Sequence, residues 1–299
     1  MGLLMSRAPP RRPLSTRLDD VSIRPQVGGA RVCPRGEEPV MQVDFGRTSS
    51  DYVRHRAGFP EAFFERLDRE GLLRSGLRAV DLGTGTGTVA RGLAQRGAVV
   101  TGLDVSADML DAARGLASGM GLGIDFRQAP AENTGLPSQA FELVVAGQCW
   151  HWFDRPAAAR EAARLLVPGG RLVIAHFDWL PLPGNVVEAT ERLIERFNPG
   201  APAPFVSLSQ SSGVYPPWFR DAAEAGFTQL TSFSFDVSVS YSPRAWRGRI
   251  RASAKVGASM PASAVSGFDA ALADLLAGSF PADSLDIPHR VFALLATRP

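Results

Sequence analysis

The stretch that decides the fold is Val80-Asp81-Leu82-Gly83-Thr84-Gly85-Thr86-Gly87. Apolar residues lead into it from residue 77, and apolar residues at helical spacing follow it from Thr88. Glycines between a strand and a helix permit a tight turn and let a ligand approach the backbone, and the amides that open the helix favour an anionic group. The spacing is G-x-G-x-G, which differs from the dinucleotide fingerprint G-x-G-x-x-G. We therefore expect a ligand-binding loop here, with a purely structural strand-to-helix turn as the alternative.

Strands and helices alternate around this loop. The predicted strands cover residues 77–82, 98–103, 124–127, 141–147, 171–176, 227–240 and 290–296. Predicted helices cover 88–96, a segment capped by Ser106, a segment from Asp154 to Pro168-Gly169-Gly170, 186–197, 218–225, a segment opened by Ser242-Pro243, and 262–277. Nearly continuous apolar strands that alternate with helices are typical of a parallel sheet covered on both faces. The predicted fold class is α/β, a doubly wound, mostly parallel sheet of seven strands.

The charge distribution limits the classes of partner. The formal net charge is +2, but residues 1–40 hold seven arginines against four acids, and the rest of the chain holds 25 basic and 26 acidic side chains. The basic character therefore lies in the N-terminal segment, and we expect neither a nucleic-acid nor a membrane partner for the body. No apolar run reaches the length of a membrane helix, about 18 residues, and no secretory signal pattern is present. We expect a cytoplasmic protein.

Other residue types bear on the domain organisation and on metal binding. Residues 1–40 contain six prolines and no sustained periodicity, which predicts a disordered leader, and translation from Met41 is one hypothesis for its origin. Residues 41–299 are predicted to form one domain, which begins with two short helices split at Phe59-Pro60. Two cysteines, Cys33 and Cys149, are too few for a disulfide framework or a cysteine zinc cluster, and the four histidines have no metal-ligand spacing.

A second acid, Asp104, stands at the end of the next predicted strand. A carboxylate in this place can accept hydrogen bonds from both hydroxyls of a ribose. The alternative is that Asp104 only assists the helix cap formed by Ser106. Together with Asp81 and the three glycines, Asp104 predicts an adenosine-like ligand across the carboxyl ends of the first two strands.

Five segments occur in an order that resembles a known family. They are DLGTGTG (81–87), GLDVS (102–106), QAPAENTGLP (128–137), FELVVAGQCWHWFD (141–154) and LLVPGGRLVI (165–174). The chain resembles the class I S-adenosylmethionine-dependent methyltransferases, and more narrowly the methyltransferase type 11 branch that includes trans-aconitate methyltransferase. The resemblance covers roughly residues 43–298. It implies that residues 41–75 form a helical lid and that residues 177–217 form a substrate-cap insertion after strand five.

The resemblance also implies which residues bind the cofactor, S-adenosyl-L-methionine. Three glycines would line its methionine part: Gly83, Gly85 and Gly87. Asp81 would contact its amino group, Asp104 its ribose and Val105 its adenine. The remaining implied contacts are Ala131 and Glu132 at the adenine edge, Gln148 facing the transferred methyl, and Tyr52 and Arg56 at the lid. Pro130 departs from the family pattern next to the adenine contact.

The chemistry is expected directly after the fourth strand. His151 would act as a general base or as a hydrogen-bond donor to a carboxylate, or else serve only as a buried structural histidine. Trp150, Trp152 and Phe153 offer aromatic faces to a sulfonium, although some of these rings, Trp152 first, would only anchor the turn. Arg244, Arg247 and Arg251 share one helix face, which is either a solvated surface or a grip for an acidic substrate.

These observations combine into one functional hypothesis. The chain is expected to be an S-adenosylmethionine-dependent methyltransferase acting on a small molecule, with O-methylation, including that of a carboxylate, slightly favoured, and to be a monomer or homodimer without a metal. The alternatives are an NAD(P)-dependent oxidoreductase, which the loop spacing disfavours, and a catalytically inactive S-adenosylmethionine-binding protein.

Overall fold

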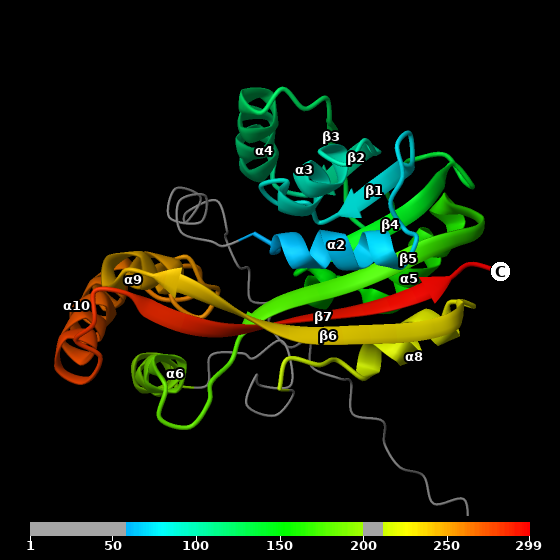
Figure 1. Cartoon of the computed structure of the whole chain (residues 1–299). Coiled ribbons are helices and arrows are strands. Elements are labelled where there is room, and N and C mark those ends of the chain that lie inside the picture. Colours follow the sequence, from blue (N-terminus) through cyan, green and yellow to red (C-terminus); the bar gives the residue numbers. More distant parts are fainter. Residues whose placement is uncertain (1–57, 200–211) are drawn as a thin grey trace, which may run out of the picture. The chain divides into compact units, whose positions relative to one another are not determined.

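The computed structural model describes residues 58–199 and 212–299, which belong to one compact unit of the chain (Figure 1). The predicted leader, the first of the two predicted lid helices, and the lid residues Tyr52 and Arg56 lie outside the described residues. The second predicted lid helix is α2 (Glu61–Arg69), which begins directly after Pro60.

Seven strands form one sheet with the order β3-β2-β1-β4-β5-β7-β6. Their bounds are β1 (Arg78–Leu82), β2 (Val99–Asp104), β3 (Asp125–Gln128), β4 (Phe141–Gly147), β5 (Leu166–Trp179), β6 (Thr228–Tyr241) and β7 (Leu285–Thr297). Strands β1 to β5 pair in parallel, whereas β7 pairs antiparallel with both β5 and β6. The predicted doubly wound, mostly parallel sheet of seven strands is confirmed.

The strand order reverses beside β1. The chain first proceeds from β1 through β2 to β3 and then returns to place β4 on the other side of β1. In open α/β sheets a crevice opens beyond the carboxyl ends of the strands at such a reversal, and ligands bind there. The glycine loop that follows β1 lies at this position.

Helices cover both faces of the sheet because its central strands are apolar on both sides. One core cluster joins Val80, Val144 and Ile174 to α5 (Arg155–Leu165) and α8 (Pro217–Glu224). The other face carries α2, α3 (Thr88–Ala94) and α4 (Ala107–Gly119).

Three of the helix caps were predicted, each by a side chain that lies next to its helix in sequence. Ser106 accepts the N–H of Met109 at the start of α4, and Asp154 accepts that of Ala157 at the start of α5. Ser242 accepts the N–H of Ala245 at the start of α9 (Pro243–Arg251). Each cap satisfies a backbone donor that the helix itself leaves unpaired.

A third core lies where β5, β6 and β7 extend past the shorter strands. It joins α6 (Val186–Phe197), α9 and α10 (Ala262–Ser279) around Trp179, Trp246 and Phe268. The helices α9 and α10 are inserted between β6 and β7, so this helical cap is built from two insertions. The predicted insertion, residues 177–217, begins inside β5, since Phe177, Asp178 and Trp179 are still paired with β7.

Two predicted boundaries are wrong. The helix expected to end at Pro168-Gly169-Gly170 ends at Leu165, and the proline and glycines belong to β5. They are held as strand because Gly169 donates to the carbonyl of Arg298 at 2.9 Å and Arg298 donates back to Gly170 at 2.9 Å. The last strand begins at Leu285 instead of Arg290, because Leu285 to His289 pair with β6.

Candidate functional site

The glycine loop after β1 is held in a conformation that side chains disfavour. Gly83, Gly85 and Gly87 have φ values of 61°, 54° and 77°. Thr84 within the loop donates its N–H to the carbonyl of Leu103 at 2.7 Å, which ties the loop to β2. A Cβ on Gly83 would lie 2.8 Å from Cβ of Cys149, so the loop packs directly on the turn that follows β4. Glycine is therefore required at position 83 for both backbone conformation and space.

Asp81 lies beneath the loop and organises it. Its Oδ2 accepts the hydroxyl of Thr84 at 2.6 Å and the N–H of Ala90 at 3.1 Å, and the side chain is only 1% exposed. Burial raises the pKa of Asp81 to about 7, although both hydrogen bonds oppose the rise. The carboxyl therefore connects β1, the loop and the first turn of α3. Its predicted contact with the amino group of a cofactor stays a prediction.

Asp104, the last residue of β2, holds the other side of the loop. Its Oδ2 accepts the N–H of Gly85 at 2.8 Å and its Oδ1 accepts the N–H of Ser106 at 2.9 Å. Each carboxylate oxygen can accept more than one hydrogen bond, so these contacts leave acceptor capacity for ribose hydroxyls. Val105 follows with 66% of its surface exposed, which suits an apolar platform for a planar ring.

The segment after β3 connects this region to α5. Ala131 is buried in the core, whereas Glu132 is half-buried and accepts the N–H of Asp154 at 2.9 Å. Gln128, at the end of β3, donates its side-chain amide to the carbonyl of Val105 at 2.8 Å. These bonds orient the chain around Val105 and the start of α5, and the adenine contacts of Ala131 and Glu132 stay predictions.

The turn after β4 carries the predicted chemistry. Gln148 has a φ of 59°, which costs a residue with a Cβ about 1–2 kcal/mol. Its N–H donates to the carbonyl of Ala175 at 2.8 Å, and its side-chain amide donates to the carbonyl of Phe177. The strained Gln148 is thus held from β5 at the carboxyl end of the sheet.

The next three residues form the 3₁₀ turn η2 (Trp150–Trp152). Trp150 is fully buried and its indole N–H donates to Asp221 of α8 at 3.0 Å. Trp152 is 40% exposed. Trp150 therefore anchors the turn, and its burial in the core speaks against the aromatic face that it was expected to offer to a ligand. The anchoring role expected of Trp152 stays a prediction.

His151 belongs to a chain of hydrogen bonds that sequence reasoning missed. Its Nδ1 is 2.9 Å from Nε2 of His176, and Nδ1 of His176 is 2.8 Å from Oδ2 of Asp178. The hydroxyl of Tyr215 donates to the same Oδ2, and its ring stacks on that of Trp218 at 4.1 Å. The available signal was the His-x-Asp spacing of 176 and 178, which places both side chains on one face of a strand.

The predicted arginine stripe on α9 is mostly occupied by an ion pair. Arg247 Nε lies 3.1 Å from Oδ1 of Asp269 on α10, and Arg251 Nη1 lies 2.6 Å from the same oxygen. Burial alone would raise the pKa of Asp269, but the two guanidinium groups together hold it below its ordinary value. Arg244 is exposed. A substrate role for Arg244 and Arg247 stays a prediction.

A fourth arginine of α9, absent from the predicted stripe, faces the interior. Arg249 is 9% exposed, and its guanidinium lies 4.4 Å from the ring centroid of Trp179, the last residue of β5. It therefore sits where the helical cap meets the carboxyl end of the sheet.

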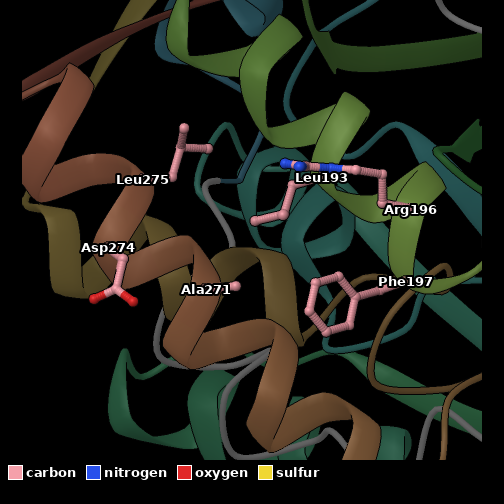
Figure 2. A pocket seen from close by; sticks show the side chains of 6 residues that line it. All are labelled: Leu193, Arg196, Phe197, Ala271, Asp274 and Leu275. Atoms are coloured by element: carbon pink, nitrogen blue, oxygen red, sulfur yellow. The ribbon is translucent and has the colours of Figure 1, made fainter.

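A pocket of about 420 Å³ opens between α6 and α10 in the cap (Figure 2). Its lining residues are Leu193, Arg196, Phe197, Ala271, Asp274 and Leu275. None of them belongs to the glycine loop, to the end of β2 or to the turn after β4. Within residues 58–199 and 212–299, no cluster of His, Cys, Asp or Glu could hold a metal ion, and no helix is long and apolar enough to span a bilayer.

The strand order with an antiparallel β7, the glycine loop after β1 and the acid that ends β2 agree with the resemblance to the class I S-adenosylmethionine-dependent methyltransferases. Residues 80–174 match the protein family described as "Methyltransferase domain". The chain therefore carries a domain of this class.

Relatives by sequence agree with this assignment. The chain is 35% identical to the uncharacterized methyltransferase Rv3342 of Mycobacterium tuberculosis over 133 residues, 44% of this chain and 51% of the relative. It is 41% identical to the demethylmenaquinone methyltransferase of Thermus thermophilus over 103 residues, 33% of this chain and 47% of that one. The chain thus spans about half the length of the curated relatives it matches.

Solved structures support the fold. A protein of Anaeromyxobacter dehalogenans that carries a provisional type II methyltransferase name superimposes with a TM-score of 0.60 at 21% identity, covering 81% of this chain and 98% of that chain. A phosphoethanolamine N-methyltransferase of Haemonchus contortus in complex with S-adenosylhomocysteine superimposes with a TM-score of 0.50 at 20% identity. The match covers 84% of this chain and 57% of that chain. None of the comparisons singles out the trans-aconitate-like branch, which stays a prediction.

The residues of this chain fit S-adenosylmethionine, the cofactor of the class. The three glycines of the loop carry no side chain that would keep a ligand away from the backbone. Asp104 retains acceptor capacity beside it, and Val105 offers an exposed apolar surface one residue further on. The NAD(P) alternative lacks support, because neither the loop spacing nor any of these comparisons points to it.

Proposed function

We propose that this chain transfers a methyl group from S-adenosylmethionine to a small-molecule acceptor, with an oxygen as the acceptor atom. The observation that carries the proposal is the hydrogen bond from Gly85 to Asp104, because it joins the glycine loop to the carboxylate that we expect to bind the ribose. This arrangement supports binding of an adenosine with a short charged chain. We place the reaction in the cytoplasm and assign the protein no nucleic-acid partner.

When bound, S-adenosylmethionine supplies an electrophilic methyl group on a sulfonium, whose S–C electron pair stays on sulfur as the methyl leaves. The protein's part is to align the acceptor with this methyl and to exclude water. Gln148 and His151 stand at the carboxyl end of β4, where the acceptor would approach. The exposed ring of Trp152 lies 4.9 Å from that of His151 and can cover the acceptor.

His151 favours an acceptor with a proton to lose. An alcohol or phenol becomes nucleophilic only as its proton leaves, and a histidine within hydrogen-bond reach can take that proton. A carboxylate needs no base, so a carboxylate acceptor would use His151 as a hydrogen-bond donor instead. The two cases predict different outcomes for the same variant.

The test has two parts. Titration of the full chain with S-adenosylhomocysteine and, separately, NADPH is expected to show binding of the first alone. Turnover of labelled methyl donor against small alcohols, phenols and carboxylic acids is then expected to yield a product one methylene heavier than an acceptor. His151→Ala should spare S-adenosylhomocysteine binding and lower kcat by about 10²-fold or more for a phenol or alcohol. Absence of S-adenosylhomocysteine binding would refute the proposal.

A further inference from the structure

We propose that His176, Asp178 and Tyr215 form a relay behind His151, which fixes the tautomer of His151 as a base and receives the positive charge once His151 has taken a proton. The inference rests on the proposed function, and it adds three positioning residues to it. The relay gathers side chains from three separate segments: η2, strand β5 and the residues before α8.

Protonation within the relay follows from the donors and acceptors around His176. The hydroxyl of Tyr215 uses its proton on Asp178, so its oxygen, 3.2 Å from Nδ1 of His176, can only accept there. The carboxylate of Asp178 also only accepts. Both neighbours of Nδ1 are therefore acceptors, and His176 must carry a proton on Nδ1.

The same argument extends to His151. A neutral His176 that is protonated at Nδ1 has its lone pair at Nε2, which is 2.9 Å from Nδ1 of His151. His151 must then donate from Nδ1, and its own lone pair lies at Nε2. That nitrogen is the one that can take a proton from an acceptor hydroxyl. Asp178 thus sets the tautomer of a histidine that it does not touch.

Proton balance along the relay is simple. As the acceptor oxygen forms its bond to the methyl group, its O–H bond breaks and the proton binds Nε2 of His151. The Nδ1 proton of His151 can then pass to Nε2 of His176. The product is a His176 imidazolium held 2.8 Å from the Asp178 carboxylate, a buried ion pair in place of an isolated charge. One proton has left the acceptor, and one net proton resides on the relay until it is released to water.

Other charged groups around the relay have partners or stay neutral. On α8, Asp221 accepts the indole N–H of Trp150 and lies 3.6 Å from Arg155 of α5. On β7, His289 has its pKa lowered to about 4, first by burial and also by the charge of Arg249 on α9, so it is neutral at physiological pH. Asp178 is thus the carboxylate that contacts Nδ1 of His176 in the relay.

A cluster with a purely structural role would show the same distances, but a substitution of Asp178 would not change the tautomer of His151. Replacement of Asp178 by Asn is isosteric, and the amide can donate to Nδ1 of His176. His176 would then carry its proton on Nε2 and donate to His151, which would in turn be protonated at Nε2. With Nδ2 of the Asn facing His176, both tautomers flip, and His151 loses its lone pair at the nitrogen that meets the acceptor. The same substitution in a Ser-His-Asp triad acts by imposing the wrong tautomer.

The chain is well suited to a direct test because it has only four histidines. Long-range ¹H–¹⁵N spectra of the full-length ¹⁵N-labelled chain, saturated with S-adenosylhomocysteine, report which nitrogen of each imidazole is protonated. His151→Gln and His176→Gln assign the signals. We expect both histidines protonated at Nδ1 in the unaltered chain, both at Nε2 in Asp178→Asn, and recovery of the Nδ1 form in Asp178→Glu.

The matched control is Asp236→Asn, which removes the carboxylate paired with Arg290 between β6 and β7. It should leave both tautomers unchanged. His151 protonated at Nε2 in the unaltered chain would overturn the relay, and so would an unchanged His151 in a folded Asp178→Asn protein whose His176 has lost its Nδ1 proton. If Asp178→Asn does not fold, Tyr215→Phe with the same spectra tests whether the Nδ1 form of His176 survives on Asp178 alone, as the relay requires.

Failure of the relay and failure of the proposed function are distinguishable. Calorimetry on the same samples shows whether S-adenosylhomocysteine binds, which depends on the glycine loop and Asp104 and not on Asp178. Binding together with the wrong tautomers refutes the relay alone. With an alcohol or phenol acceptor in hand, Asp178→Asn should also lower kcat by about 10²-fold or more while the affinity for S-adenosylhomocysteine stays the same.

Discussion

The backbone N–H of Gly85 donates to Oδ2 of Asp104 at 2.8 Å, so the middle of the glycine loop is bound to the last residue of β2. The same carboxylate holds Ser106 at the start of α4 through its other oxygen. One side chain thus fixes the loop after β1 and the turn after β2, the two segments between which an adenosine would lie.

Asp104→Ala is expected to weaken S-adenosylhomocysteine binding by about tenfold to a hundredfold. The change removes both the acceptor for ribose hydroxyls and the bond that shapes the loop, and a hydrogen bond to a charged group contributes about 1.5–3 kcal/mol. Isothermal titration calorimetry measures the effect. Asp125→Ala, which removes an exposed acid of the neighbouring strand β3, should bind like the unaltered chain. Wild-type affinity in Asp104→Ala would show that the ribose assignment is wrong.

Gly83→Ala and Gly135→Ala form a pair that separates backbone strain from crowding. Both glycines have positive φ, 61° and 68°, so each alanine should cost about 1–2 kcal/mol of unfolding free energy. A Cβ at position 83 would also meet Cys149 and Phe153 within 3.0 Å, whereas one at position 135 meets nothing within 4 Å. We expect urea unfolding to show that Gly83→Ala lowers the free energy of unfolding by about 1–3 kcal/mol more than Gly135→Ala does. Equal losses would mean that the loop can move away from the turn after β4.

Asp81 should make the ligand-free chain less stable as pH rises from about 4 to about 7. The unfolded chain releases this proton near pH 3.8, but the folded chain keeps it to about pH 7, so the folded state binds the extra proton in this window. The stabilisation is complete below pH 3.8 and falls by about 1.4 kcal/mol per pH unit until pH 7. Urea unfolding at several pH values measures the slope.

Asp81→Asn isolates this contribution. The Asn side chain can still accept from Thr84 and Ala90 but does not titrate, so we expect its stability relative to the unaltered chain to increase with pH between 4 and 7. Asp68→Asn, on the exposed side of α2, should keep the slope of the unaltered chain. If the stability of Asp81→Asn changed with pH in the same way as that of the unaltered chain, the group that titrates would be a residue other than Asp81.

Arg247 and Asp269 should behave as a structural pair. Each of Arg247→Ala and Asp269→Ala is expected to lower stability, and the double-mutant cycle should give a coupling of about 1 kcal/mol, since the pair is only half-buried. Arg244→Ala, on the exposed side of the same helix, should show no coupling to Asp269. Absence of coupling for Arg247, together with a raised KM for an acidic acceptor, would restore its predicted role in substrate binding.

Features that depend on neighbouring residues were predictable from the sequence. The caps Ser106, Asp154 and Ser242 were identified because a capping side chain bonds a backbone donor only three positions away. The glycine loop and β4 were placed correctly for a similar reason, since their periodicity is local.

Features that depend on long-range pairing were predicted poorly. Pro168-Gly169-Gly170 is a typical helix stop, yet Arg298, far away in sequence, makes it part of β5. Leu285 to His289 contain Pro288, which weakens a strand pattern, yet they pair with β6 and the carbonyl of Pro288 accepts the N–H of Leu180. In both cases hydrogen bonds across the sheet override the local preference of the chain.

The candidate site divides in the same way. His151 and Gln148 were marked by their place after an apolar strand, and Asp104 by its distance from the glycine loop. The partners of His151 were not, because His176, Asp178 and Tyr215 are brought together only when β5 lies beside β4 and Trp218 of α8 packs against His176. Sequence spacing also placed three arginines on one face of α9 without revealing that Asp269 of α10 occupies that face.

The sequence by itself therefore determined the class of protein, the position of the glycine loop and the turn where chemistry is expected, because each is encoded within a few consecutive residues. Only the tertiary structure decided which side chains surround that turn, which tryptophan is buried and which arginines are already paired. The physical reason is that hydrogen bonds and burial between distant segments depend on the packing of the whole sheet, and no local pattern specifies that packing.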